Sequence, residues 1–227
     1  MSEWWTYRPE DFLLFSPRVY WRMFELQNET LWPLHLVTVA AGLVIILVLL
    51  RRPKHGGGLI GFFLATLWVF VGWSFLWNRY AAINWAITYV IPIFALQALM
   101  LAIASITRGG LTFDRRGVAG WAGLLLATCG LVLYPLLPPL TERPLPSAEV
   151  FGIAPDPTAI VTLGLLLAAR GRLLPTLLPI PLLWCVLSSL TLWAMDDQQA
   201  WLPLLVVAIV LVALGLQSVI RHYGRGA

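Results

Sequence analysis

Residues 157–172 read PTAIVTLGLLLAARGR, an uncharged stretch from Pro157 to Ala169 that ends at Arg170 and Arg172. A helix rises 1.5 Å per residue, so this stretch would extend about 20 Å, whereas the hydrocarbon core of a bilayer is roughly 30 Å thick. Six longer uncharged stretches flank it, at 32–50, 58–77, 83–106, 117–135, 174–194 and 201–220. If the short stretch is also embedded, the sequence predicts an all-α fold: a polytopic transmembrane helix bundle with seven spans.

The composition is that of a membrane protein. Of the 227 residues, 59% are hydrophobic and only 11% are charged, whereas about 25% are charged in an average soluble domain. Such a chain cannot cover a globule with polar surface, which excludes a cytosolic enzyme, a disordered chain and a nucleic-acid binder. The net charge of +4 rests on 15 scattered Lys and Arg residues, too few for a phosphate-binding patch. The two cysteines, Cys129 and Cys185, lie in apolar runs and form neither a disulfide framework nor a CxxC metal site.

The charges sort into two kinds of loop that alternate along the chain. One set holds a single acid, Asp114, and ten basic residues: Arg51, Arg52, Lys54, Arg108, Arg115, Arg116, Arg170, Arg172, Arg221 and Arg225. The opposite set holds five basic residues and ten acids: Arg8, Arg18, Arg22, Arg79 and Arg143, with Glu3, Glu10, Asp11, Glu25, Glu29, Glu142, Glu149, Asp156, Asp196 and Asp197. Cytoplasmic ends of spans are rich in Lys and Arg, so we expect the N-terminus outside and the C-terminus in the cytoplasm. Without a span at 157–169 the alternation would fail.

Two regions are expected: a periplasmic, interfacial amphipathic segment at residues 1–30 and the seven-helix transmembrane bundle at residues 31–227. Trp prefers the membrane–water interface, and nine of the twelve tryptophans fall at or near the predicted outer ends: Trp4, Trp5, Trp21, Trp32, Trp73, Trp77, Trp85, Trp193 and Trp201. We interpret them as an anchoring belt, with an aromatic vestibule as the alternative.

The N-terminal sequence indicates a short helix that begins at Pro9, then a break, then a longer helix. Ser16 is the expected N-cap of the longer helix and Pro17 its first residue. One face of the longer helix carries residues spaced by three or four positions: Tyr20, Phe24 and Gln27. This pattern suits an amphipathic helix in the outer membrane interface. The alternative is a lid over the spans or a docking surface for a partner.

Polar side chains in or beside the spans are the candidate functional residues, because a bilayer makes them costly. The predicted ligand-binding set lies near the outer ends: Asn28, Glu29, Trp32, His35, Asn84, Asp156 and Thr158. Asp156 is the expected N-cap of the short span, with Pro157 as its first residue. The irregular stretch 144–155 before it should then dip into the bundle, and such half-helix starts present N–H groups to substrates in transporters. The alternative is a tilted or short helix that Asp156 merely caps.

His35 has two interpretations. It either bonds to Glu29 or a backbone carbonyl as a structural residue, or it accepts a proton or ligates a pigment. Haem held by two histidines is excluded because His55 and His222 lie on the cytoplasmic side, and a retinal protein is excluded because the only lysine, Lys54, lies in a loop. No Walker A, HExxH or GxSxG motif occurs. We therefore predict no catalytic residue and no metal site, and the sequence identifies no cofactor.

Short motifs in a consistent order resemble those of a known family: Asn28-Glu29 with Trp32-Pro33, Ala82-Ile83-Asn84, Phe94, Leu96-Gln97-Ala98, Tyr134-Pro135, Phe151-Gly152, Pro155-Asp156-Pro157-Thr158 with Thr162 and Gly164, Ile180-Pro181 and Leu183-Trp184. On these the chain resembles the DUF6064 family of bacterial integral membrane proteins. The resemblance implies a multi-pass protein of the bacterial cytoplasmic (inner) membrane and no defined activity. Two positions depart from the family pattern. Asp156 replaces an expected Cys, which weakens a thiol or soft-metal account, and Trp85 replaces an expected Pro.

Two functions fit these observations. The first is a small-solute permease or solute-binding membrane protein with an outward-facing polar site, surrounded by the lipid bilayer. The alternative is a non-catalytic accessory subunit of a larger membrane complex, or a homo-oligomer, that docks through its Trp-rich end. An intramembrane enzyme with Glu29 and Asp156 as paired carboxylates has the least support, and no nucleic-acid partner is expected. Convergence of Glu29, Asn84 and Asp156 on one cavity would favour the first function.

Overall fold

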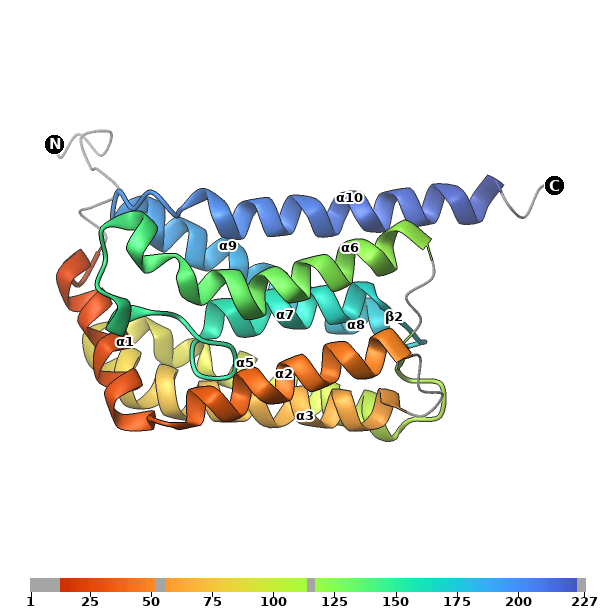
Figure 1. Cartoon of the computed structure of the whole chain (residues 1–227), viewed down its shortest axis with the longest axis horizontal. Coiled ribbons are helices and arrows are strands. Elements are labelled where there is room, and N and C mark those ends of the chain that lie inside the picture. Colours follow the sequence, from red (N-terminus) through yellow and green to blue (C-terminus); the bar gives the residue numbers. More distant parts are fainter. Residues whose placement is uncertain (1–12, 52–55, 114–116, 224–227) are drawn as a thin grey trace, which may run out of the picture.

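Six apolar helices run along the length of a bundle in the computed structural model, which describes residues 13–51, 56–113 and 117–223 (Figure 1). Each is long and apolar enough to cross a membrane: Leu34–Arg51, Gly56–Ile83, Trp85–Ile106, Gly117–Leu136, Leu174–Ala194 and Trp201–Val219. They coincide with six of the seven predicted spans. The prediction of an all-α bundle of long apolar helices is confirmed.

Several of these helices are built from more than one segment. In chain order the segments are α2 (Leu34–Arg51); α3 (Gly56–Val71), η3 (Gly72–Tyr80) and α4 (Ala81–Ile83); η4 (Trp85–Tyr89) and α5 (Ile91–Ile106); α6 (Gly117–Thr128), η5 (Cys129–Leu133) and η6 (Tyr134–Leu136); α8 (Leu174–Leu177) and α9 (Pro179–Ala194); and α10 (Trp201–Tyr223). Segments η3 and η5 are π-helical. A π-turn is wider than an α-turn and shifts the side chains beyond it. Tyr80 ends η3 and Tyr134 follows η5, and both are buried.

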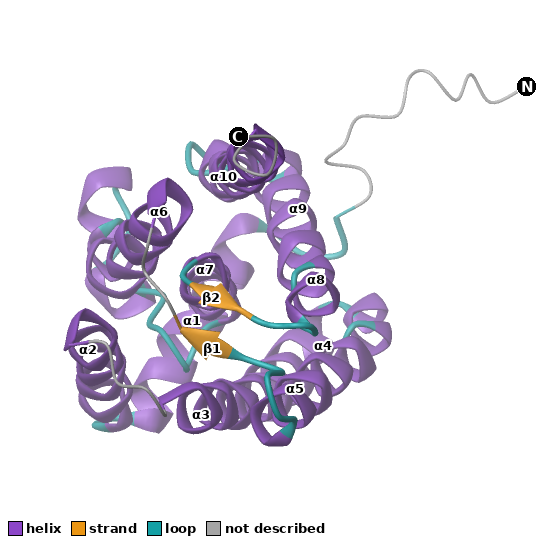
Figure 2. Cartoon of the chain, turned by 90° about the vertical axis from the view of Figure 1, so that its right-hand side faces the viewer, coloured by secondary structure: helices purple, strands orange, loops and turns teal. Residues whose placement is uncertain are grey.

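The short predicted span is helix α7 (Pro155–Leu167), which lies in the centre of the bundle with the other helices around it (Figure 2). All thirteen of its residues are buried. Just beyond it, strand β2 (Ala169–Arg170) pairs antiparallel with β1 (Thr112–Phe113). A helix enclosed by protein needs no lipid-facing length, and this explains why so short a helix suffices. That α7 counts as a seventh crossing remains a prediction.

Small residues let α6 and α7 pack closely. A Cβ atom added to Gly164 would lie 2.5 Å from the backbone N of Ala127, and one added to Gly123 would lie 2.4 Å from the carbonyl oxygen of Gly164. Close backbone approach through small residues is the usual way helices pack in membranes, where van der Waals contact replaces the hydrophobic effect. The two glycines therefore hold α7 against its neighbour.

The segment leading into α7 is buried, as the irregular sequence predicts. After the short turns η7 (Pro138–Thr141) and η8 (Leu145–Ser147), the residues from Glu149 to Ala154 run into the bundle. Gly152 adopts φ +75°, in contact with side chains of α2 and α3. Its N–H donates to Thr158 Oγ1 at 2.8 Å, and that hydroxyl donates to the Ala154 carbonyl at 2.6 Å. Thr158 thus satisfies the Gly152 N–H, which has no partner within a helix.

Helix α1 (Pro17–Leu31) crosses the end of the bundle and begins as predicted, with Ser16 accepting a hydrogen bond from the Val19 N–H at 3.4 Å. Its buried residues are Tyr20, Trp21, Met23, Phe24 and Gln27. The rings of Tyr20 and Phe24 pack on Tyr80 and Phe75 of η3 at centroid distances of 5.7 and 4.7 Å. The shorter helix predicted from Pro9 lies outside the described residues, and the position of α1 in a membrane interface remains a prediction.

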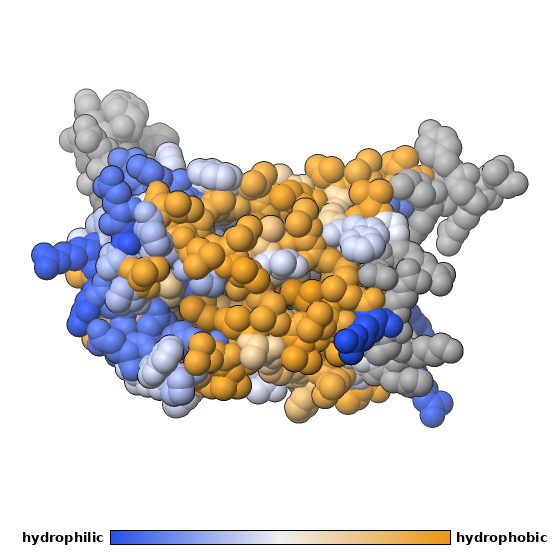
Figure 3. Space-filling model, viewed as in Figure 1, coloured by the Kyte–Doolittle hydropathy of each residue, from blue (hydrophilic) through white to orange (hydrophobic). Residues whose placement is uncertain are grey.

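The two ends of the bundle differ in charge. The acids within the described ranges all belong to the α1 end: Glu25, Glu29, Glu142, Glu149, Asp156, Asp196 and Asp197. The β1–β2 end carries Arg51, Arg108, Arg170 and Arg172. An apolar band separates the ends (Figure 3). Six tryptophans of the α1 end expose more than half of their surface: Trp32, Trp73, Trp77, Trp85, Trp193 and Trp201.

The α6–α7 contact makes a testable prediction. Gly164→Ala should lower the free energy of unfolding by about 1–3 kcal/mol, because its Cβ would force two backbones apart. The matched control is Gly215→Ala on α10, where an added Cβ meets nothing within 4 Å. Thermal unfolding of both variants in detergent is the measurement. Equal stability of the two variants would contradict this account of the packing.

Candidate functional site

Asp156 is the central polar group of the bundle. The expectation that it caps α7 was wrong: the helix begins one residue earlier, at Pro155, and Ala154 occupies the N-cap position. Asp156 lies inside the first turn, with its side chain 3% exposed. Its carboxylate accepts hydrogen bonds from Trp184 Nε1 at 2.8 Å, Ser188 Oγ at 2.5 Å and Tyr134 Oη at 3.1 Å. These donors take the side chain away from the helix end that it was expected to cap.

The three donors come from two other helices. Trp184 and Ser188 are four residues apart on α9, so they share one face, and Tyr134 follows the π-helical segment η5. A carboxylate removed from water is costly unless donors replace the water it loses. Three donors, together with a position in the first turn of α7 where the helix dipole is positive, favour the charged form. Asp156 is therefore a buried carboxyl group, supplied with three donors, at the point where α6, α7 and α9 meet.

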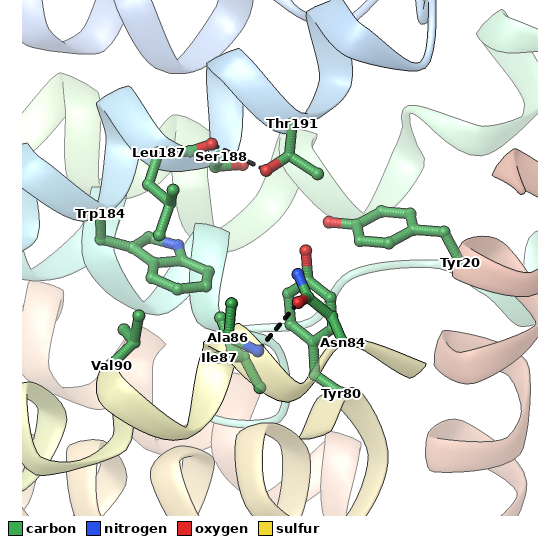
Figure 4. Close-up of a pocket in the computed structure, with 10 residues that line it drawn as sticks. All are labelled: Tyr20, Tyr80, Asn84, Ala86, Ile87, Val90, Trp184, Leu187, Ser188 and Thr191. Atoms are coloured by element: carbon green, nitrogen blue, oxygen red, sulfur yellow. Dashed lines mark hydrogen bonds between the residues drawn. The ribbon is translucent and has the colours of Figure 1, made fainter. Parts of the chain in front are cut away.

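A cavity of about 90 Å³ lies at this end of the bundle, and Figure 4 shows the residues that line it. Its lining comes from α1, the end of η3, the η4 turn and α9: Tyr20, Tyr80, Asn84, Ala86, Ile87, Val90, Trp184, Leu187, Ser188 and Thr191. The rings of Tyr20, Tyr80 and Trp184 surround it from three sides. Trp184 and Ser188 line the cavity and also donate hydrogen bonds to Asp156, so the cavity lies directly beside the carboxylate.

The cavity wall is rich in hydrogen-bond acceptors. Ser188 gives its proton to Asp156, and Thr191 gives its proton to the Leu187 carbonyl at 2.9 Å. Both hydroxyl oxygens can also accept, and Thr191 shares a hydrogen bond with the Tyr80 hydroxyl. Asn84 uses its Oδ1 to accept the Ala86 N–H at 3.1 Å. Ala86 is exposed and Thr191 is half-buried, so the cavity opens between η4 and α9.

A second buried cluster surrounds Glu149. Its side chain is 3% exposed and lies 3.8 Å from Nη1 of Arg143, whose side chain is 7% exposed. Arg143 also donates to Gln199 Oε1 at 2.8 Å and Thr141 Oγ1 at 3.2 Å, and its guanidinium lies 3.5 Å from the ring centroid of Trp21. Burial raises the pKa of the Glu149 carboxyl well above its usual value; the nearby Asp156 raises it further and Arg143 opposes the shift.

Asn28 and His35 form a third group. Asn28 Nδ2 donates to the carbonyls of Pro146 and Ala148, both at 2.7 Å, and its Oδ1 lies 2.9 Å from His35 Nε2. The expected partners of His35, Glu29 or a backbone carbonyl, were wrong, because the chain turn between α1 and α2 brings Asn28 closer. Since an amide oxygen only accepts, Nε2 carries the proton, and the buried Nδ1 has no hydrogen-bond partner. This group ties the α1–α2 corner to the loop that holds Glu149.

The remaining predicted residues lie apart from the cavity. The Glu29 side chain is 59% exposed and lies 3.6 Å from Arg22, and Trp32 is 67% exposed beside His35. Thr158 stabilises the loop before α7. Of the three residues expected to converge, Asn84 lines the cavity and Asp156 lies behind its wall, whereas Glu29 faces away. Within the described ranges, His, Cys, Asp and Glu side chains form no group of three or more that could hold a metal ion.

Several residues of these clusters were absent from the predicted set, among them Tyr134, Arg143, Glu149 and Trp184. An aromatic side chain with a polar tip inside an apolar span needs a partner, and this rule could have identified Tyr134 and Trp184 as donors for Asp156. The burial of Arg143 and Glu149 could not be predicted in this way, because both residues lie in a connection whose composition is that of an ordinary polar loop.

Comparison with known proteins identifies a family but no function. A family model described as "Family of unknown function (DUF6064)" matches residues 17–223, nearly the whole chain. Neither a curated protein nor a solved structure matches the chain. The match confirms the resemblance inferred from the motifs.

The hydrogen bonds that Asp156 accepts lead to a testable prediction. Trp184→Phe keeps an aromatic ring but removes the indole N–H, so it should destabilise the protein by about 1.5–3 kcal/mol, the usual value of a hydrogen bond to a charged group. Trp193→Phe on the same helix is the matched control, because that ring is 61% exposed. Thermal unfolding in detergent should separate the two variants, and a Trp184→Phe protein as stable as its control would argue against an ionised Asp156.

Proposed function

Because the chain belongs to the DUF6064 family, whose function is unknown, we propose a function from the chemistry of its own buried site: the protein binds a small cation of the ammonium type in the cavity beside Asp156. The observation that carries this proposal is a buried carboxyl group, supplied with three donors, behind a cavity wall that carries the hydroxyl oxygens of Ser188 and Thr191. Solute binding at an outward-facing polar site is the role that this geometry supports best.

Charge and hydrogen bonding favour a cationic donor. The Asp156 carboxylate makes the cavity electrically negative, and a low-dielectric surrounding screens that charge poorly. The lone pairs of Ser188 and Thr191 can accept from N–H groups. The faces of Tyr20, Tyr80 and Trp184 attract cations through their ring quadrupoles. An anion would meet none of these favourable contacts.

The size of the cavity limits the ligand. A protein cavity of about 150 Å³ accommodates benzene, and this one holds about 90 Å³. Ammonium and methylammonium are therefore of suitable size, whereas tetraethylammonium is too large. Toward the β1–β2 end the bundle is filled by Trp68, Phe94 and Leu163, each no more than 1% exposed. This filling supports a binding conformation closed toward that end rather than an open channel.

Titration calorimetry with methylammonium chloride tests the proposal. The protein in detergent should bind the cation saturably, Asp156→Asn should abolish binding, and Thr191→Val should weaken it about tenfold through loss of one acceptor. Thr107→Val is the matched control, because Thr107 also donates to a carbonyl four residues earlier but lies exposed at the opposite end. Tetraethylammonium should not compete.

Two results would contradict cation binding. One is the absence of saturable binding of either ammonium or methylammonium. The other is equal affinity in the protein, Asp156→Asn and Thr191→Val. A chain that purifies only together with other membrane proteins, and that binds neither cation, would instead favour the accessory-subunit role.

The proposal also places the α1 end outside the cell, in the membrane orientation that the charge distribution predicts. A fluorescent protein that folds only in the cytoplasm should be active when fused after the last residue. A reporter enzyme that is active only after export should be inactive at the same position. Removing the positive charges of Arg170 and Arg172 is expected to weaken this preference. Activity of the exported reporter alone would reverse the orientation.

A further inference from the structure

The Glu149–Arg143 pair is incompletely satisfied although it is buried. Arg143 Nη1 and Glu149 Oε2 both lack a hydrogen-bond partner, and the 3.8 Å between Nη1 and Oε1 is too long for a hydrogen bond. Buried polar atoms are nearly always paired, so two unpaired atoms in one cluster need an explanation. A carboxyl group that gains and loses a proton provides one.

The titratable groups around Glu149 come from five parts of the chain. The groups that interact with it or with its neighbours are Arg143 on its own loop, Asp156 on α7, Asp197 in the turn before α10, Tyr20 on α1 and Tyr134 after η5. The two tyrosines are neutral, because burial raises the pKa of Tyr20 well above its usual value and Tyr134 donates its proton to Asp156. Asp197 caps the turn at Gln199 and lies at the half-buried edge.

A charge count then assigns one proton. Asp156 is held as an anion by its three donors, and Arg143 is always a cation, so the two balance each other. An ionised Glu149 would leave one uncompensated negative charge in the protein interior, which is costly. In the absence of a bound cation, Glu149 therefore keeps its proton.

We propose that Glu149 is a proton-binding residue coupled to the cation cavity, and that it releases its proton to the outer solution when a cation binds beside Asp156. This inference rests on the proposed function. In the exchange the O–H bond of the carboxyl breaks, the proton goes to water, and the arriving cation replaces its charge, so the buried net charge is unchanged. Linkage is reciprocal, so a protonated Glu149 must weaken cation binding by the same factor that the cation weakens proton binding.

The sign of the pH dependence follows. Cation affinity should rise as pH rises, by about tenfold per pH unit while Glu149 remains mostly protonated, and should level off once it is ionised. Glu149→Gln cannot release a proton, so its affinity should be independent of pH and equal to the low-pH affinity of the protein. Glu142→Gln, an exposed acid at the end of η7 in the same connection, is the matched control and should behave as the unmodified chain.

Calorimetric titration with methylammonium in two buffers of different ionisation enthalpy measures the protons released. We expect one proton per cation for the protein and Glu142→Gln, and none for Glu149→Gln. Cation binding without proton release, or unchanged release in Glu149→Gln, overturns the coupling but leaves the proposed function intact. If methylammonium and ammonium do not bind at all, the proposed function fails and the coupling fails with it.

Infrared difference spectroscopy tests whether Glu149 carries the proton, and it does so without a ligand. A protonated-carboxyl band should be present in the cation-free protein at neutral pH, absent in Glu149→Gln and retained in Glu142→Gln. A band that persists in Glu149→Gln places the proton elsewhere and overturns the assignment to Glu149.

Discussion

The buried carboxylate of Asp156 is the constraint on which the arrangement of this bundle depends. A charge at the centre of an apolar assembly is tolerated only when donors reach it. Here Tyr134, Trp184 and Ser188 supply those donors at 2.5–3.1 Å. Each donor fixes the rotation of its helix about its own axis, because a turned helix would withdraw its hydrogen bond. The polar interaction thus specifies how α6, α7 and α9 face one another, whereas apolar packing alone would permit several rotations.

The position of Asp156 requires an unusual central element. A helix of thirteen residues can start inside the bundle only if the chain before it is also buried, and irregular backbone there must find its own partners. Thr158 satisfies the Gly152 N–H and the Ala154 carbonyl, while Gly123 and Gly164 permit the close approach of α6. These local features have one consequence: they bring the first turn of α7, with its carboxylate, next to a cavity that opens to the surface.

The polar clusters at this end are connected through one loop. Asn28 donates to the carbonyls of Pro146 and Ala148, which lie just before Glu149 in the chain, and Arg143 donates to Gln199 beside α10. The aromatic contacts of Tyr20 then link α1 to the cavity wall. Helix α1 is therefore part of the site rather than a separate cover, and a change in charge at Glu149 acts on groups that also shape the cavity. This connection gives a physical route for the proposed coupling of proton release to cation binding.

The helices and their order could be predicted from the sequence, because apolar length and flanking charges are properties of single segments. The sequence predicted six long helices, a short one and the Ser16 cap, and it proposed Asn84 and Asp156 for a polar site at one end. It could not determine what Asp156 bonds to, that His35 meets Asn28 and not Glu29, or that Glu149 and Arg143 are buried. Those facts depend on the rotation of each helix and on the path of a loop, and only packing between segments far apart in the chain decides them. The tertiary structure therefore decided which polar residues share a cavity, since a carboxylate is satisfied by neighbours in space and not by neighbours in sequence.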